Sequence, residues 1–417
     1  MNFVVVGNGV AGNSAASVIR KQNKKVKITL VTEEDSPAYS ACALGNYIAN
    51  EINEKYLYIR SLNEYKNQNI HIMFNQKVNS IDLKSNILFA NHRKIPFDKL
   101  ILATGSLPLI LPIPGHKLRG VFTLKTINNA KKIINHNPNK VVIVGSGPIG
   151  IEAAVSLKKK NCEVVLIEVQ NRILPNLFDE KPSEIIKKIL ENNGIKVFTR
   201  EKVLEFRGKE KVSMVVTDKR KIKCDTVIMA VGMKPNTQLA KDCSLKLSST
   251  GSILVNRKME TSNHDVYACG DCVETSNLFT GTINSSMLWH NAKQQGDIAG
   301  YNLLGFTKNY KGHFSIVGIN LFRNHAVAIE KPGDFFQKEN IRIIEKSSTS
   351  GYYRIIIKSD FIRGAQYIGH FDDFGLLFTL MKSANEMNIG FSVLKENHTK
   401  TKNIFAHRIF KYFSELK

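Results

Sequence analysis

Near its start the chain alternates a short apolar run with a stretch of small and polar residues. The β-branched and aromatic run Phe3 to Val6 predicts a strand, Asn13 to Lys21 predicts a helix, and Val26 to Val31 predicts a second strand. A strand, a helix and a second strand in this order form a βαβ unit with parallel strands.

The same pattern occurs a second time further along the chain. Lys140 to Val144 predicts a strand, Ile151 to Lys160 a helix, and Glu163 to Glu168 the next strand. Two βαβ units in one chain predict an α/β protein in which each unit belongs to a parallel sheet of its own.

After Lys311 the pattern changes to strands that follow one another without intervening helices. A third, α+β domain is therefore expected. Asn403 to Leu416 is amphipathic, which is typical of a core or subunit contact, and the alternatives are a membrane-surface or partner helix. The elements predicted here are strands Phe314 to Ile319, Ala326 to Ile329, Tyr352 to Lys358 and Ile362 to Ile368, and helix Phe374 to Met387.

Composition is that of an ordinary globular protein. The 417 residues are 43% hydrophobic and 23% charged, which suits two or three domains. The chain has no run of about 18 apolar residues, so we expect no membrane span. The first residues lack the basic and apolar regions of a secretory signal. We therefore expect a cytoplasmic protein.

The net charge of +23 has the sign that favours nucleic acid or an anionic membrane surface. The lysines, however, are spread along the whole length, and no polybasic tract marks a binding tail. A nucleic-acid partner is therefore disfavoured.

Six cysteines are scattered through the chain, at positions 42, 162, 224, 243, 269 and 272. This is not the pattern of a disulfide framework. Cys269 and Cys272 form a CxxC, but no second pair completes a zinc ligand set, so we expect no metal site. The two side chains are expected to fill small spaces beside the turn that they flank.

A GxGxxG sequence follows the first strand of each βαβ unit. In the first, Gly7 makes a tight turn, Gly9 lets a pyrophosphate approach the backbone, and Gly12 packs the helix on the strand. The helix N-terminus then faces the phosphates, and Glu33 and Glu34 follow the second strand, where a ribose lies in this geometry. The residues of this turn predicted to bind a dinucleotide are Gly7, Gly9, Val10, Ala11 and Gly12.

The second fingerprint predicts a second dinucleotide. Glu168 can accept hydrogen bonds from both ribose hydroxyls, whereas it would repel a 2′-phosphate. No Arg stands at that strand end, although Arg172 is nearby, so NAD is favoured over NADP. The residues predicted for this site are Gly145, Gly147, Pro148, Ile149, Gly150 and Glu168, with Gly232 after a later strand.

Four motifs together resemble the FAD-dependent pyridine nucleotide-disulfide oxidoreductase family. They are the two fingerprints, Ala103-Thr104-Gly105, and Tyr267-Ala268-Cys269-Gly270-Asp271, in that family's order over roughly residues 1 to 300. The resemblance implies two Rossmann-like domains, for FAD and NAD, and a C-terminal α+β dimerisation domain. The implied boundaries are 1–115 and 246–310 for the FAD domain, 116–245 for the inserted NAD domain, and 311–417 for the C-terminal domain.

The resemblance also implies which residues hold FAD. The first fingerprint would bind the FAD pyrophosphate, and Glu33 or Glu34 would bind the adenosine ribose. In the family this carboxylate commonly stands one position earlier, where this chain has Thr32, so the choice between Glu33 and Glu34 stays open. A helix N-terminus near Asn291 and Ala292 faces the flavin pyrimidine, where its partial positive charge would stabilise a reduced anionic flavin. The other implied positions are Val78 at adenine through its backbone, Gly270 and Asp271 at the ribityl chain, and Ala103, Thr104 and Gly105.

Cys42, within Ser40 to Leu44, resembles the single-cysteine branch of coenzyme A disulfide reductases, NADH oxidases, NADH peroxidases and sulfur or polysulfide reductases. That branch implies a catalytic thiol cycling between thiolate and sulfenate, persulfide or mixed disulfide. The alternative is a small cysteine packed under FAD. Arg354 to Lys358 and Gly364 to Gly369 instead resemble NADH-dependent rubredoxin and nitrite reductase flavoproteins, which leaves the acceptor open.

We therefore predict an FAD- and NAD(P)H-dependent oxidoreductase, a homodimer, that passes hydride equivalents from NADH through FAD to a small thiol, disulfide, persulfide or dioxygen by way of Cys42. One alternative is a reductase of a protein electron carrier such as rubredoxin, without a redox cysteine. Another is a redox-sensing, nucleic-acid-binding flavoprotein. His290, just before the flavin-facing helix, is a weaker candidate proton donor, because a surface or capping histidine is the more common case.

Overall fold

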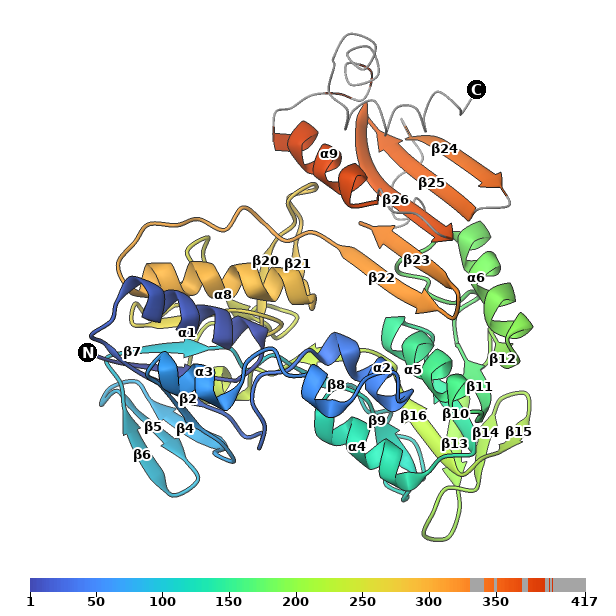
Figure 1. Ribbon diagram of the computed structural model, residues 1–417, viewed down its shortest axis with the longest axis horizontal. Coiled ribbons are helices and arrows are strands. Elements are labelled where there is room, and N and C mark those ends of the chain that lie inside the picture. The colour runs from blue at the N-terminus through green and yellow to red at the C-terminus, as the bar shows by residue number, and fades with distance from the viewer. Residues whose placement is uncertain (331–340, 349–350, 370–373, 387–389, 391, 393–417) are drawn as a thin grey trace. The chain divides into compact units, whose positions relative to one another are not determined.

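The computed structural model describes residues 1–330, 341–348, 351–369, 374–386, 390 and 392. It divides the chain into two compact units. One comprises residues 1–109, 125–132 and 232–314, and the other comprises residues 110–124 and 133–231 with the described part of 315–417. Both units contain a five-stranded parallel sheet with helices, so the predicted α/β class is confirmed (Figure 1).

The parallel sheet of the first unit has the strand order β19-β7-β1-β2-β3. The central strand β1 is buried on both faces: Phe3 and Val5 belong to one hydrophobic cluster, and Val4 and Val6 belong to another. Burial on both faces explains the continuous apolar run in the sequence. The bounds are β1 Asn2–Val6, β2 Lys27–Val31, β3 Ile70–Met73, β7 Lys99–Leu102, β19 Val266–Ala268, α1 Val10–Gln22 and α8 Trp289–Leu303.

Helices α1 and α8 pack side by side over this sheet (Figure 1). A Cβ atom at Gly296 would lie 2.2 Å from the carbonyl oxygen of Ala11, and one at Gly300 would lie 2.8 Å from that of Ala15. The two backbones therefore approach more closely than larger side chains would allow. This contact places the start of α8 near the first glycine turn.

Shorter elements complete the first unit. They form an antiparallel sheet β4-β5-β6, a sheet β18-β20-β21 and the pair β17-β8. The 3-10 turns are η1 Ala41–Ala43 and η2 Glu54–Tyr56, and the short helices are α2 Leu44–Ile48, α3 Leu62–Asn67 and α7 Gln238–Asp242. The strands are β4 Val78–Asp82, β5 Ile87–Ala90, β6 Arg93–Pro96, β8 Ser106–Pro108, β17 Met233–Pro235, β18 Ile253–Leu254, β20 Val273–Ser276 and β21 Ile283–Ser285.

The parallel sheet of the second unit has the order β12-β11-β10-β16-β9, and β13-β14-β15 form an antiparallel sheet beside it. Helix α4, Ile127–His136, begins in the first unit and ends in the second. The other bounds are β9 Val121–Thr123, β10 Lys140–Val144, α5 Pro148–Lys159, β11 Glu163–Ile167, α6 Glu180–Asn192, β12 Ile195–Phe198, β13 Val203–Arg207, β14 Met214–Thr217, β15 Lys221–Lys223 and β16 Thr226–Met229.

The C-terminal part of the second unit is an antiparallel sheet of order β22-β23-β26-β25-β24 with helix α9. The four strands and the helix predicted here are confirmed, with ends that shift by one or two residues. Strand β24 was not predicted, because it is an edge strand whose side chains are mostly exposed. The bounds are β22 Ile316–Leu321, β23 Asn324–Ile329, β24 Ile341–Ser348, β25 Gly351–Lys358, β26 Phe361–Gly369 and α9 Phe374–Glu386.

The sequence also predicted an amphipathic C-terminal stretch and no membrane span. The amphipathic stretch Asn403 to Leu416 lies outside the described residues. Among the residues that are described, every helix is too short or too polar to cross a membrane.

Candidate active site

The first glycine turn has the geometry that a dinucleotide phosphate requires. Gly7 has φ +110°, and a Cβ there would lie 2.1 Å from the carbonyl oxygen of Ala103. A Cβ at Gly12 would lie 2.1 Å from the carbonyl oxygen of Gly7, so helix and strand touch at this point. At Gly9, which caps α1, a Cβ would meet nothing within 4 Å. The protein therefore leaves open space where a pyrophosphate would approach the helix N-terminus.

Two further motifs meet this turn at the carboxyl edge of the same sheet. Ala103-Thr104-Gly105 follows β7, and Gly270 and Asp271 follow β19, which pairs with β7. Gly270 has φ +87°, and a Cβ there would lie 3.0 Å from that of Ala11. Open α/β sheets bind their ligands at this edge. The fold thus brings together all the predicted FAD motifs, which are far apart in sequence.

Asp271 is paired with two residues that the sequence left unassigned. Ser106 Oγ donates a hydrogen bond of 2.6 Å to its Oδ2. Lys125 Nζ lies 3.3 Å from the same oxygen. Lys125 stands 146 residues from Asp271 and outside any motif, so only the folded chain reveals the pair. Together these two donors fix the orientation of the Asp271 carboxylate at the sheet edge.

The structure distinguishes the two candidate ribose carboxylates. Tyr39 Oη donates a 2.7 Å hydrogen bond to Glu34, and burial raises the pKa of Glu34. Glu33 is exposed at the end of β2. The amide of Gln76 donates to the carbonyl of Thr32 at 2.8 Å, which brings the start of β4, at Val78, toward the same strand end. Of the two carboxylates, Glu33 is therefore the more accessible to a ligand.

Helix α8 begins two residues earlier than the sequence predicted. Its cap is Leu288, and the amide of Ala292 already donates to the Leu288 carbonyl at 3.0 Å. The amides without an intrahelical acceptor are thus those of residues 289–291. His290 Nε2 donates to the carbonyl of Phe314 at 3.0 Å and its ring stacks on Phe314, while burial lowers the pKa of His290. This favours a packing role for His290 over proton donation.

Cys42 is exposed, in the 3-10 turn η1 that leads into α2. Residues 36–40, which precede Cys42, are hydrogen-bonded at both ends. Asn8, between the first two glycines, donates to the carbonyl of Ser36 at 3.1 Å, and the amide of Ser40 donates to the carbonyl of Leu57 at 2.8 Å. The glycine turn itself therefore anchors the segment that presents the thiol.

Cys269 and Cys272 are both fully buried. Cys269 belongs to the hydrophobic cluster on one side of the parallel sheet, and Cys272 belongs to the cluster on the other side. Burial raises the pKa of both thiols. They pack as small apolar groups, as the sequence suggested, and the described residues contain no cluster of His, Cys, Asp and Glu that could hold a metal ion.

The second glycine turn repeats the geometry of the first. Gly145 has φ +99°, and a Cβ there would lie 2.4 Å from the carbonyl oxygen of Ala230. A Cβ at Gly150 would lie 2.0 Å from that of Gly145, and a Cβ at Gly147 would meet nothing within 4 Å. Pro148 opens α5, a position where its missing N–H costs nothing. The second turn therefore leaves the same open space for a dinucleotide phosphate as the first.

Glu168 lies directly after β11 and is 7% exposed. Its Oε2 accepts hydrogen bonds from the amide of Ser146 at 2.9 Å and from the Ser146 hydroxyl at 2.6 Å. Its Oε1 accepts one from the amide of Gln170 at 2.9 Å. Ser146, fully buried between two glycines, is a residue that sequence reasoning missed. It fixes the carboxylate that is predicted to meet the nicotinamide dinucleotide's ribose.

The structure also places three other residues. Arg172 donates to the backbone carbonyls of Phe178 and Pro175 at 3.1 and 3.2 Å, so its guanidinium contributes to the fold of its own loop. Gly232 belongs to the first compact unit, where its carbonyl accepts from the amide of Leu109 at 2.9 Å. Burial raises the pKa of Glu152, on α5, to about 7.

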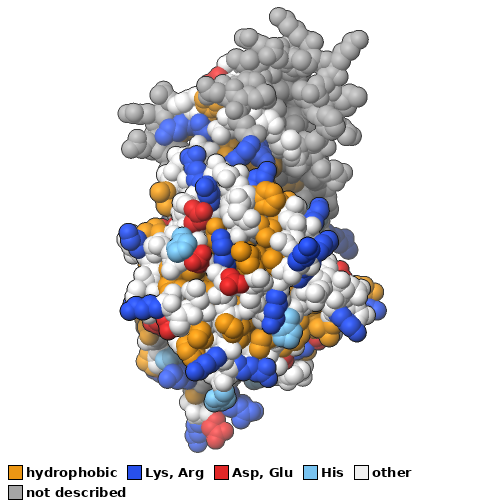
Figure 2. Space-filling view, turned by 90° about the vertical axis from the view of Figure 1, so that its left-hand side faces the viewer, with side chains coloured by type: hydrophobic (Ala, Val, Ile, Leu, Met, Phe, Trp, Pro, Cys, Tyr) orange, Lys and Arg blue, Asp and Glu red, His pale blue; other side chains and the backbone are white. Residues whose placement is uncertain are grey.

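The basic charge of the chain does not form a single patch on the face shown in Figure 2. Lys and Arg side chains are scattered there among hydrophobic and uncharged ones. Nucleic-acid-binding proteins instead gather their basic residues along one stripe or groove. This face offers no such stripe among the described residues.

Comparison with known proteins agrees with these two nucleotide-binding turns. The family described as "Pyridine nucleotide-disulphide oxidoreductase" matches residues 1–296. An NADH oxidase of Methanocaldococcus jannaschii is 37% identical over 316 residues, which cover 73% of this chain and 70% of that protein. An NAD(P)H coenzyme A polysulfide/persulfide reductase of Pyrococcus horikoshii is 29% identical and covers 79% and 75% of the two chains. Among solved structures, an NAD-dependent persulfide reductase from A. fulgidus superposes with a TM-score of 0.88 at 26% identity, over 95% of this chain and 79% of that one.

The fold and the two glycine turns define a two-dinucleotide oxidoreductase. The chain belongs to the pyridine nucleotide-disulphide oxidoreductase family. It is an FAD- and NAD(P)H-dependent oxidoreductase, with FAD and NADH as cofactors.

Proposed function

We propose that this chain uses NADH to reduce a small persulfide at Cys42, with dioxygen as a second acceptor. The observation that carries the proposal is the exposed Cys42, presented by a segment that the glycine turn itself anchors through Asn8. The similarity to a persulfide reductase and to an NADH oxidase supports this choice of acceptors.

In this proposal the first unit holds FAD and the second holds NADH. The turn Gly7 to Gly12 receives the FAD pyrophosphate, Glu33 the ribose and Asp271 the ribityl chain, and Gly145 to Gly150 with Glu168 receive NADH. A flavin held by these residues would supply hydride acceptance from NADH and onward electron transfer. The open amides at the start of α8 stabilise negative charge that develops nearby. The domain boundaries 1–115, 116–245, 246–310 and 311–417, the homodimer and the cytoplasmic location are further predictions of the proposal.

The thiol chemistry at Cys42 balances as follows. The Cys42 thiolate attacks the sulfur bonded to carbon in a persulfide R–S–SH, forms the mixed disulfide Cys–S–S–R and releases HS⁻. Two electrons, which NADH supplies, and one proton then cleave the mixed disulfide to R–SH and the Cys42 thiolate. A thiolate is the reactive form in such an exchange. Exposure of the Cys42 side chain allows the acceptor to reach it.

Replacing Cys42 by Ser tests this role. A hydroxyl cannot take the place of the thiolate, so we expect turnover with a persulfide such as glutathione persulfide to fall by about a hundredfold or more. Reduction of an artificial dye by NADH should change less than about twofold, because that reaction needs no protein nucleophile. Steady-state assays of both reactions on the flavin-loaded protein make the comparison.

The half-buried Cys243 provides the matched control, because Cys243→Ser makes the same chemical change at the C-terminal end of α7. That variant should keep both activities. If Cys42→Ser retains full persulfide turnover, the Cys42 side chain has only a packing role. The hypothesis of a reductase for a protein electron carrier is then favoured.

A further inference from the structure

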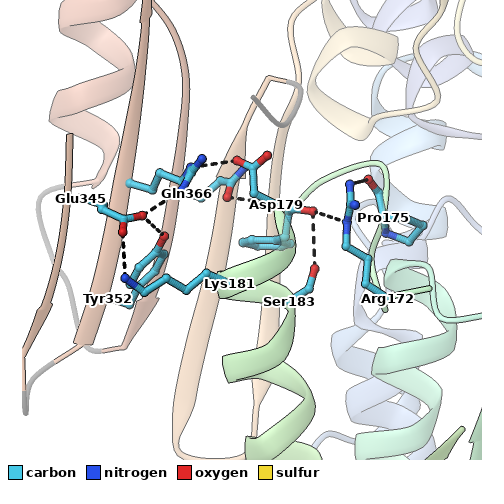
Figure 3. Close-up of polar contacts among 10 residues, drawn as sticks. Arg172, Pro175, Asp179, Lys181, Ser183, Glu345, Tyr352 and Gln366 are labelled. Atoms are coloured by element: carbon cyan, nitrogen blue, oxygen red, sulfur yellow. Dashed lines mark hydrogen bonds and ion pairs between the residues drawn. The ribbon is translucent and has the colours of Figure 1, made fainter. Parts of the chain in front are cut away.

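Side chains of the C-terminal sheet bind Asp179, at the end of the loop that follows Glu168. Gln366 on β26 donates a 2.9 Å hydrogen bond from Nε2 to Asp179 Oδ2, and the amide of Asp179 donates back to Gln366 Oε1 at 3.2 Å (Figure 3). Arg354 on β25 brings its Nε to 3.0 Å from the same Oδ2, an ion pair without hydrogen-bond alignment. Gln366 is 1% exposed and Asp179 6%. A carboxylate buried this deeply is held firmly by its partners.

The loop between Glu168 and Asp179 is held rigid by its own hydrogen bonds, so a constraint at Asp179 extends along the loop. Arg172 donates to the carbonyls of Phe178 and Pro175, and Ser183 Oγ lies 3.4 Å from the carbonyl of Phe178 (Figure 3). Ser183 Oγ also donates to the carbonyl of Ile173 at 2.8 Å. The side chain of Phe178 is fully buried. Residues 170–179 therefore form a fixed connector with one end at Asp179.

The other end of this connector touches the second glycine turn. Leu174 has φ +49°, a left-handed backbone conformation that is strained for a residue with a large side chain and persists only where the surrounding structure holds it. Its amide donates to the carbonyl of Ser146 at 3.2 Å, and its side chain is 1% exposed. Ser146 in turn donates twice to Glu168. A continuous set of contacts thus runs from the C-terminal sheet to the ribose carboxylate.

We infer that the C-terminal sheet positions the NADH site, with Gln366 and Arg354 acting on Glu168 through Asp179, Leu174 and Ser146. This inference rests on the proposed role of Glu168 at the NADH ribose. Gln366 and Arg354 are positioning residues. When their contacts with Asp179 are lost, the strained backbone at Leu174 can relax and Ser146 can shift. Glu168 then loses its fixed orientation. The consequence is weaker binding of NADH and weaker rejection of NADPH, without an effect on the flavin.

The test replaces Gln366 by Leu, which keeps the volume of the side chain and removes both hydrogen bonds. On the flavin-loaded protein we expect the KM for NADH and the Kd for NAD⁺ to rise about tenfold, while kcat at saturating NADH and the flavin content stay within about twofold. The ratio of NADPH to NADH turnover should rise. Asp179→Asn, a milder and isosteric change, should shift the same quantities in the same direction.

Arg363→Met is the matched control. Arg363 lies on the same strand, but its guanidinium donates to Asn385 of α9 at 2.9 Å. A general loosening of the C-terminal sheet would affect both variants, whereas the inference predicts an unchanged KM for Arg363→Met.

The Glu168→Ala background separates positioning from a merely structural effect. Since the effect of Gln366 runs through Glu168, adding Gln366→Leu to Glu168→Ala should raise the Kd for NAD⁺ by less than about twofold. An unchanged Kd in Gln366→Leu, or a tenfold loss that persists undiminished in the Glu168→Ala background, overturns the inference. If Glu168→Ala itself binds NAD⁺ normally, the assignment of the ribose site fails instead, which is a different result.

Discussion

The Gly9→Ala variant is expected to fold like the natural chain and to be purified nearly without colour. A Cβ at Gly9 meets no protein atom within 4 Å, and its φ of −71° and ψ of −178° suit alanine. The methyl group instead occupies the space through which the FAD pyrophosphate approaches α1. We expect the affinity for FAD to fall by about a hundredfold or more, which is about 3 kcal/mol. The flavin-to-protein absorbance ratio after desalting measures the loss.

Gly318→Ala is the control for this variant. Gly318 is an exposed residue of β22, and a Cβ there also meets nothing within 4 Å. The two variants make the same chemical change in equally open surroundings, so circular dichroism should show both folded. Only Gly9→Ala should lose the flavin. A Gly9→Ala protein that is as yellow as the natural one would remove the first glycine turn from the FAD site.

Changing Glu168 to Ala together with Val169 to Arg is expected to reverse the preference for NADH over NADPH. The Ala removes the carboxylate that would repel a 2′-phosphate, and Val169, 58% exposed beside it, allows an Arg to reach that phosphate. We expect the ratio of kcat/KM for NADPH to that for NADH to rise by about a thousandfold, which is about 4 kcal/mol. Steady-state kinetics with each nucleotide give the ratio.

The single variant Val169→Arg shows which change matters. With Glu168 in place the new Arg can pair with that carboxylate, so the ratio should move by less than about tenfold. If the double variant still strongly prefers NADH, Glu168 does not contact the ribose.

The sequence predicted the parallel sheets well because their signals are local. Each glycine turn carries its strand, its helix and its steric requirement within about thirty residues, and the Cβ distances at Gly7, Gly12, Gly145 and Gly150 follow that logic. Strand β24 was missed because an edge strand buries few side chains, so Ile341 to Ser348 show no clear period of two.

The residues that support the sites were harder to predict, because their partners are far away in sequence. Lys125 meets Asp271 only after the chain folds, and Gln366 meets Asp179 across 187 residues. Ser146 occupies a variable position of the fingerprint, where almost any residue satisfies the motif. Only its buried bonds to Glu168 show that its hydroxyl is used.

In the proposed reaction, NADH bound at the turn Gly145 to Gly150 reduces a flavin held at the turn Gly7 to Gly12. Anaerobic titration of the purified, flavin-loaded protein with NADH tests it most directly. We expect stoichiometric NADH to bleach the flavin absorbance rapidly. An additional equivalent of NADH should be consumed when Cys42 starts in an oxidised form, and no such addition should occur in Cys42→Ser. A protein that takes up no flavin, or whose bound flavin stays oxidised under excess NADH, would contradict it.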